Sequence, residues 1–163
     1  MFLSPKENVL EFGFLPGQKI ADLGAGTGHY ALALSRILGP SARIYAVDIQ
    51  EGALSRLKKQ ALDEGLRNVD VMLGDLEKPY GTRLRTDLVD GVVVSNTLSQ
   101  IEDKQAFISE IDRILARKGR VALVDWKEKL EKDAVRKLFE GRGFSFERGF
   151  LAGGHHYVLI FKK

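Results

Sequence analysis

Two acidic residues and a run of glycines have the types and spacing of a ligand-binding crevice. Asp22 closes an apolar segment and is followed by Gly24, Gly26 and Gly28, and Asp48 closes the next apolar segment. Glycine reaches left-handed conformations and has no side chain to keep a ligand away, while carboxylates accept hydrogen bonds from amino and hydroxyl groups. An ordinary tight turn, with Asp48 as a helix cap, is the alternative interpretation.

The spacing of the glycines indicates which ligand the crevice would hold. Residues 24–28 read G-x-G-x-G, whereas dinucleotide-binding enzymes use G-x-G-x-x-G for a pyrophosphate. Asp22 would repel a phosphate but suits a ligand with an amino group, and Asp48 lies where an acid accepts both hydroxyls of a ribose. A nicotinamide-dependent oxidoreductase is therefore disfavoured, and a Tyr-x-x-x-Lys catalytic pair is also missing from the sequence.

Alternating apolar patterns predict the elements that must position these residues. Periods of two and 3.6 residues, with glycine and proline between them, indicate an α/β fold with a mostly parallel sheet and helices on both faces. The last two strands, linked through Gly153-Gly154, must be antiparallel. We expect a turn-rich crossover at 78–81, strands at 18–23, 43–48, 69–73, 88–95, 120–125, 144–151 and 156–161, and helices at 5–12, 30–38, 51–64, 104–116 and 132–142.

Four motifs together resemble class I S-adenosylmethionine-dependent methyltransferases, and the likeness covers nearly the whole chain. The first two are Asp22-Leu23-Gly24-Ala25-Gly26-Thr27-Gly28 and Asp48, the third is Leu73-Gly74-Asp75-Leu76, and Val94-Ser95-Asn96-Thr97-Leu98 takes the place of the fourth. The resemblance is strongest to the small-molecule branch typified by ubiquinone/menaquinone-biosynthesis methyltransferases. It implies a Rossmann-like three-layer αβα sandwich whose seven-stranded sheet has the order 3-2-1-4-5-7-6, with the last strand antiparallel.

The resemblance also implies a cofactor and the residues that contact it. The cofactor would be S-adenosylmethionine, with S-adenosylhomocysteine as its product. Asp48 would bind the ribose, Asp75 the adenine amino group and Asp22 the amino end, although Asp75 alone could equally be a turn residue. The implied contact residues are Asp22, Gly24, Ala25, Gly26, Asp48, Ile49, Gly74, Asp75, Leu76, Ser95 and Asn96.

A general base is needed only if the methyl acceptor carries a proton at neutral pH. The candidates are His29, Asp125, His155 and His156, and histidine has a suitable pKa for this task. The alternative for His155 and His156 is a polar hairpin turn. No third ligand stands at a characteristic spacing from them, so we expect no metal site. Trp126 and Tyr157 would wall an acceptor pocket or belong to the core.

Composition limits the class of protein and its partners. The 163 residues suit a single methyltransferase domain, 1–163, with 1–17 as an N-terminal helix and lid segment. Its net charge of +3, spread among acids, gives no basic stripe for nucleic acid. The chain has no cysteine, signal peptide or apolar run long enough for a membrane span, so a cytoplasmic location is expected.

These observations favour a small molecule as the acceptor, in a site that a homodimer could close. Residues 96–99 differ from the Asn-Pro-Pro-Tyr motif with which similar enzymes orient an amino nitrogen. Two further functions stay open: a methyltransferase that acts on protein or RNA, and a non-catalytic protein that binds S-adenosylmethionine.

Overall fold

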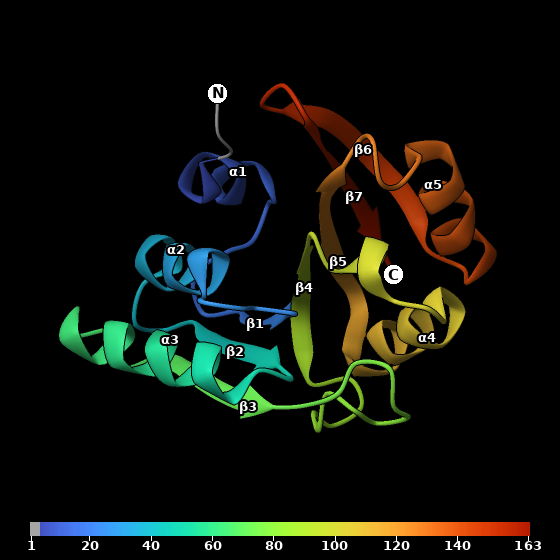
Figure 1. Cartoon of the computed structure of the whole chain (residues 1–163). Coiled ribbons are helices and arrows are strands. Elements are labelled where there is room, and N and C mark those ends of the chain that lie inside the picture. Colours follow the sequence, from blue (N-terminus) through green and yellow to red (C-terminus); the bar gives the residue numbers. More distant parts are fainter. Residues whose placement is uncertain (1–3) are drawn as a thin grey trace.

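A computed structural model describes residues 4–163, whose strands form one seven-stranded sheet between two layers of helices (Figure 1). None of the helices in this part of the chain is long and apolar enough to cross a membrane. In chain order the elements are α1 (Pro5–Glu11), β1 (Lys19–Leu23), α2 (His29–Leu38), β2 (Arg43–Asp48), α3 (Glu51–Asp63), β3 (Val69–Leu73), β4 (Val89–Ser95), the 3-10 turn η1 (Leu98–Gln100), α4 (Lys104–Ile114), β5 (Leu115–Trp126), α5 (Lys132–Gly141), β6 (Ser145–Ala152) and β7 (His156–Lys162).

The order of the strands is β3-β2-β1-β4-β5-β7-β6, which confirms the predicted fold. The first five of these strands in space pair in parallel, whereas β7 pairs antiparallel with both β5 and β6. The chain order reverses between β1 and β4. Ligands bind at such a switch point, outside the carboxyl ends of the strands, because the loops there diverge to opposite faces of the sheet.

Each face of the sheet buries its own apolar cluster. On one face α1, α2 and α3 pack through residues such as Val9, Leu34 and Leu57. On the other face α4 and α5 pack through residues such as Phe107 and Phe139. The two layers account for the near-continuous apolar sequence of β4, because both faces of a central parallel strand are buried.

Helix α1 packs against α2 rather than standing free of the domain. The Ser4 hydroxyl caps it by accepting a hydrogen bond from the Glu7 amide at 3.5 Å, as the sequence predicts. Phe12 is fully buried and stacks on Tyr30 with a centroid distance of 5.8 Å, while Leu10 is exposed. Residues 1–3 of the predicted lid segment lie outside the described residues, and the lid function stays a prediction.

The boundary between α4 and β5 differs from the prediction. The sequence predicts a helix to Ala116, but the helix ends at Ile114, and Leu115 already pairs with Val89 of β4. Residues 116–119 then bulge outward before the ladder resumes at Arg120, and Lys118 takes a left-handed φ of 66°. A single apolar pattern runs through both elements, so periodicity alone could not separate them.

The crossover from β3 to β4 contains no helix within the described residues, as the turn-rich sequence predicts. Two glycines let its backbone fold tightly, since a Cβ on Gly74 would lie 2.4 Å from the Gly81 carbonyl oxygen. The segment is fastened to α4, because Thr82 Oγ1 donates to Glu110 Oε1 at 2.6 Å and Arg113 pairs with Glu110 at 2.7 Å. These contacts fix the end of the crossover against α4.

Candidate functional site

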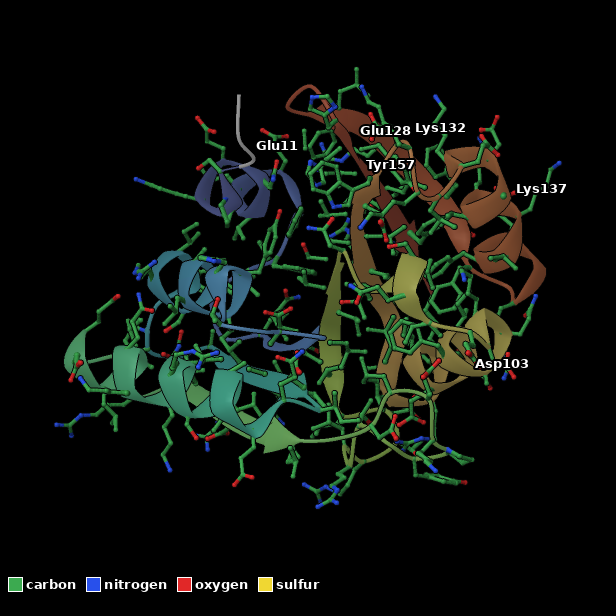
Figure 2. All side chains as sticks on the ribbon, viewed as in Figure 1. Glu11, Asp103, Glu128, Lys132, Lys137 and Tyr157 are labelled. Carbon is green, nitrogen blue, oxygen red and sulfur yellow. The ribbon has the colours of Figure 1, made fainter. Side chains whose placement is uncertain are left out.

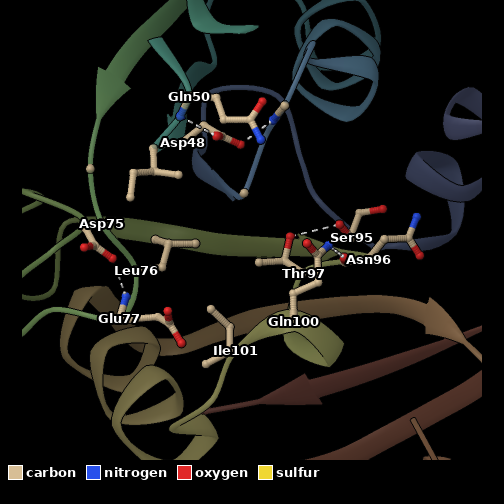
Figure 3. Close-up of a pocket in the computed structure, with 14 residues that line it drawn as sticks. Asp48, Gln50, Asp75, Leu76, Glu77, Ser95, Asn96, Thr97, Gln100 and Ile101 are labelled. Carbon is tan, nitrogen blue, oxygen red and sulfur yellow. Dashed lines mark hydrogen bonds between the residues drawn. The ribbon is translucent and has the colours of Figure 1, made fainter. Parts of the chain in front are cut away.

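A cleft lies over the switch point of the sheet, and it has two lobes. The lobes share Gly24, Gly26, Ser95 and Asn96, so they meet over the glycine loop and the end of β4. The first, about 400 Å³, we call the β2 lobe; its other lining residues are Asp48, Ile49, Gln50, Gly74, Asp75, Leu76, Glu77, Thr97, Gln100 and Ile101 (Figure 3). The second, about 490 Å³, we call the β5 lobe; its other lining residues are Pro5, Asp22, Ala25, Thr27, His29, Tyr30, Trp126 and His156.

The three glycines of the loop all have positive φ, but each meets a different neighbour. A Cβ on Gly24 would lie 2.2 Å from the Thr97 hydroxyl, and one on Gly28 would lie 2.1 Å from Leu57 of α3. A Cβ on Gly26 would meet no atom within 4 Å. Only Gly26 therefore leaves its backbone open toward the cleft, whereas Gly24 and Gly28 are required by packing within the protein.

Asp48 joins the end of β2 to the glycine loop. Its carboxylate accepts hydrogen bonds from the amides of Gly26 and Gln50, both at 2.8 Å (Figure 3). Gln50, not Asp48, is the N-cap residue of α3, so the predicted alternative role as a helix cap is not what the structure has. An ionised carboxylate has about four acceptor positions, which leaves about two for a ligand in the cleft.

Asp22 is a buried carboxyl group with an unsatisfied oxygen. The side chain is 2% exposed, and its Oδ2 atom has no hydrogen-bond partner among the described residues. Burial raises the pKa of Asp22 to about 7; a backbone hydrogen bond from Ala31 offsets part of this rise, and Asp48 adds to it by repulsion. A cationic group in the β5 lobe would stabilise the ionised form of Asp22, which burial and the nearby Asp48 both disfavour.

The β2 lobe is also lined by apolar side chains and by a second acid. Ile49 is 62% exposed although it is apolar, and it lines this lobe together with Leu76 and Ile101. Asp75 Oδ1 accepts from the Glu77 amide at 3.0 Å, so Asp75 does stabilise its own turn. Its second oxygen is left for a ligand, and the apolar side chains nearby suit the faces of a planar ring.

The end of β4 forms the floor that both lobes share. Asn96 adopts a left-handed φ of 53°, its amide donates to the Val124 carbonyl at 2.8 Å, and its buried Oδ1 lacks a partner among the described residues. Thr97 Oγ1 donates to the Ser95 carbonyl at 3.0 Å, and Gln100 donates to the Asn96 carbonyl. A strained backbone with an unused acceptor at the switch point is typical of a binding site.

Every predicted cofactor contact lines one lobe or both, but the four candidate bases do not stay together. His156 lines the β5 lobe beside Trp126, whereas His29 is exposed at its rim, 3.4 Å from the Thr27 hydroxyl. His155 is exposed and lies 3.1 Å from Glu128, which Figure 2 labels near the β6–β7 hairpin. His155 lines neither lobe.

The structure places Asp125 outside the cleft. It follows Leu123 by two positions on β5 and so points to the α4 and α5 face, where it is fully buried. Its carboxylate accepts from the amides of Ser99 at 3.2 Å and Trp126 at 2.8 Å. Asp125 therefore fixes η1 against β5, a role that sequence position alone could not distinguish from catalysis.

The charge of the cleft is one-sided. Among the described residues that line either lobe, Asp22, Asp48, Asp75 and Glu77 are acidic, and none is lysine or arginine. Such a cleft favours a cationic ligand and disfavours the pyrophosphate of a dinucleotide. The arrangement thus fits an adenosyl sulfonium with a free amino group better than a nicotinamide cofactor.

The predicted set of cofactor contacts does not include several residues that line the lobes. Gln50, Glu77, Thr97, Gln100 and Ile101 complete the β2 lobe. Each lies within a few positions of a predicted contact, so their closeness to a strand end was the available signal. Pro5 and Tyr30 join the β5 lobe because α1 packs on α2, a contact that no local pattern specifies.

This sheet order with an acidic, glycine-lined switch point defines the class I S-adenosylmethionine-dependent methyltransferase fold, and comparisons agree. A solved S-adenosylmethionine-dependent methyltransferase from Aquifex aeolicus is 24% identical, with a TM-score of 0.89 over 98% of this chain and 89% of that one. The [4+2]-cyclase SpnF has a TM-score of 0.83 at 16% identity, over 97% of this chain and 80% of that one. These two likenesses establish the fold.

The family follows from the sequence profile. The profile of the family described as "Methyltransferase domain" matches residues 15–143, and the chain belongs to this family. Family and fold imply S-adenosylmethionine as the cofactor and S-adenosylhomocysteine as the product, as the motifs predict. A ubiquinone/menaquinone biosynthesis C-methyltransferase of Pseudomonas putida is 26% identical over 136 residues, which are 82% of this chain and 51% of that protein. The chain spans about half the length of the curated relatives it matches.

Proposed function

We propose that the protein transfers the methyl group of S-adenosylmethionine to a small-molecule acceptor held in the β5 lobe. The observation that carries this proposal is the buried Asp22 oxygen, which has no partner in residues 4–163 and lines the same lobe as the open backbone of Gly26. A carboxyl group is costly to bury without a partner, so the site favours a ligand that brings a cation to it. The amino group of S-adenosylmethionine would supply that cation.

The remaining contacts follow the lobes of the cleft. The ribose hydroxyls would donate to Asp48, and the adenine ring would lie between Ile49 and Leu76 with its amino group donating to Asp75. Ser95 and Asn96 would lie below the methionine portion. These roles rest on the free acceptor positions and apolar surfaces described above.

The cofactor supplies an activated methyl group when it is bound. The protein's task is then to align an acceptor at close range, and such alignment can supply about 7–11 kcal/mol of the barrier. The β5 lobe lies next to Asp22 and the shared floor, so an acceptor there would face the sulfonium end. The name of the Pseudomonas relative supports a small acceptor, and carbon is then one candidate for the atom that is methylated.

Isothermal titration calorimetry with S-adenosylmethionine, S-adenosylhomocysteine and NAD tests the proposal directly. We expect the first two to bind and NAD not to bind. Binding of NAD instead would contradict the assignment of the cleft. The cyclase SpnF has the same fold, so a role other than methyl transfer is the second candidate. Cofactor binding without methyl transfer to a broad panel of small acceptors would favour that second candidate.

A further inference from the structure

The β5 lobe contains a histidine that the sheet fixes against a tryptophan. Trp126, at the end of β5, and His156, at the start of β7, are direct partners in the antiparallel register. Their ring centroids lie 4.0 Å apart at an angle of 44°. Both rings line the lobe whose floor is Ser95 and Asn96. The ladder of backbone hydrogen bonds therefore sets the position of His156 relative to the shared floor.

The environment of His156 favours the neutral form of its ring, and one ring nitrogen is unused. Nε2 is buried and has no hydrogen-bond partner among the described residues. Burial lowers the pKa of His156 below its usual value, and His155 lowers it further, whereas Asp125 and Glu128 oppose the shift. Across the lobe the titratable lining residues are Asp22, His29 and Tyr30. A neutral imidazole has one nitrogen with a free lone pair, and leaving such an acceptor buried and unpaired costs about 1–3 kcal/mol.

The rest of the lobe suits a flat apolar molecule with one donor. Pro5, Tyr30 and Trp126 supply an apolar wall, and rings prefer to lie on aromatic faces. Asp22 is assigned to the cofactor amine by the proposed function, on which this inference rests. Of the two histidines that line the lobe, His156 is the one whose backbone the sheet fixes and whose Nε2 is buried, while His29 is exposed. A hydroxyl on the bound ring would give Nε2 the donor that it lacks.

We propose that His156 is the catalytic base of this protein, and that it takes a proton from the hydroxyl of an aromatic acceptor stacked on Trp126. The O–H bond breaks, its proton goes to Nε2, and the imidazole becomes imidazolium. The electron pair left on the hydroxyl oxygen makes this oxygen the nucleophile, and it forms the bond to the methyl carbon. The electron pair of the broken S–C bond stays on sulfur and neutralises the sulfonium.

A chromogenic phenol tests the proton transfer without relying on turnover. 4-Nitrophenol changes colour when it ionises, and Trp126 is the single tryptophan of the chain, so its fluorescence reports on this lobe alone. The protein is first saturated with S-adenosylhomocysteine, which cannot donate a methyl group. At pH 6 we expect 4-nitrophenol to quench Trp126, and the ionised fraction of the bound phenol to exceed that of free phenol by about threefold.

Variants of the two adjacent histidines separate the outcomes. His156→Gln should keep S-adenosylhomocysteine binding but lose the extra ionisation, whereas the matched control His155→Gln should keep the extra ionisation, because His155 lines neither lobe. His156→Asn serves as a second variant if the first does not fold. Equal ionisation with and without His156, or no quenching of Trp126, would overturn the inference. Failure of S-adenosylhomocysteine itself to bind would instead contradict the proposed function, so the two failures are distinguishable.

Discussion

Replacing Asp22 by asparagine should stabilise the ligand-free protein in alkaline solution while weakening cofactor binding. The folded state holds the pKa of Asp22 at about 7 because the group is buried, against an ordinary value of 3.8. The folded state therefore binds this proton more tightly than the unfolded state does. Its contribution to stability is fully present below about pH 4 and is lost as the pH rises toward 7.

The size of the effect follows from that difference in pKa. Each pKa unit corresponds to 1.36 kcal/mol, so the ligand-free protein loses up to about 4 kcal/mol through Asp22 between pH 4 and pH 8. Asparagine has nearly the same shape and does not ionise. At pH 8 we expect Asp22→Asn to raise the free energy of unfolding by about 2–4 kcal/mol, or the Tm by several degrees.

Circular dichroism melting at pH 5 and pH 8 measures the pH dependence of the stability of the ligand-free protein. The same melts with S-adenosylmethionine measure how much the cofactor stabilises each variant. Cofactor binding should become at least about tenfold weaker in Asp22→Asn, since a hydrogen bond between two charged groups contributes roughly 1.5–3 kcal/mol. As a control, Asp63→Asn removes an exposed carboxylate paired with Lys59 and should change stability by no more than about 0.5 kcal/mol. An Asp22→Asn variant that melts below the unmodified protein at pH 8 would refute the reasoning.

Three further predictions concern the cleft. Asp48→Ala should weaken S-adenosylmethionine binding at least about tenfold, because it removes the proposed ribose acceptor and the bond to the Gly26 amide; unchanged calorimetric affinity would reject that role. Gly26→Asn should fold, since asparagine tolerates a left-handed φ, yet lose cofactor binding, while Gly17→Asn, at another open left-handed glycine, should keep it. The fluorescence of Trp126 should fall on acidification with a midpoint below 6.5, as protonated His156 quenches it, and a midpoint above 6.5 would contradict the burial of that ring.

Much of the fold was predictable because local patterns and global topology agree. Each acid of the motifs lies at or within two residues of the carboxyl end of a parallel strand, so the topology brings Asp22 and Asp48 to one edge regardless of side-chain detail. The order of the last three strands came from the family resemblance, since the sequence itself indicates only a hairpin. The boundary at Leu115 was wrong because helix and strand share one apolar run there.

The site was predictable only where a residue's neighbours along the chain determine its surroundings. Asp125 and His156 both end or begin a strand at the same edge, yet one faces α5 and the other faces the cleft. Successive residues of a strand point to opposite faces of the sheet, so a shift of one residue changes the face on which a side chain lies. The sequence pattern does not specify this register at strand ends. The contact between α1 and α2, which brings Pro5 to the lobe, joins residues far apart in the chain and leaves no local signal.

Gly24 and Gly28 pack against other residues of the protein whereas Gly26 does not, and this difference has an evolutionary consequence. Substitution at position 24 or 28 collides with Thr97 or Leu57 and would harm folding in any descendant, active or not. A side chain at position 26 would meet no neighbouring atom, so beyond its left-handed φ this position is constrained by what enters from outside the polypeptide. In a lineage that no longer binds the cofactor, position 26 can therefore be substituted more readily than positions 24 and 28. A family member that keeps the two flanking glycines but not Gly26 is then expected to have lost cofactor binding.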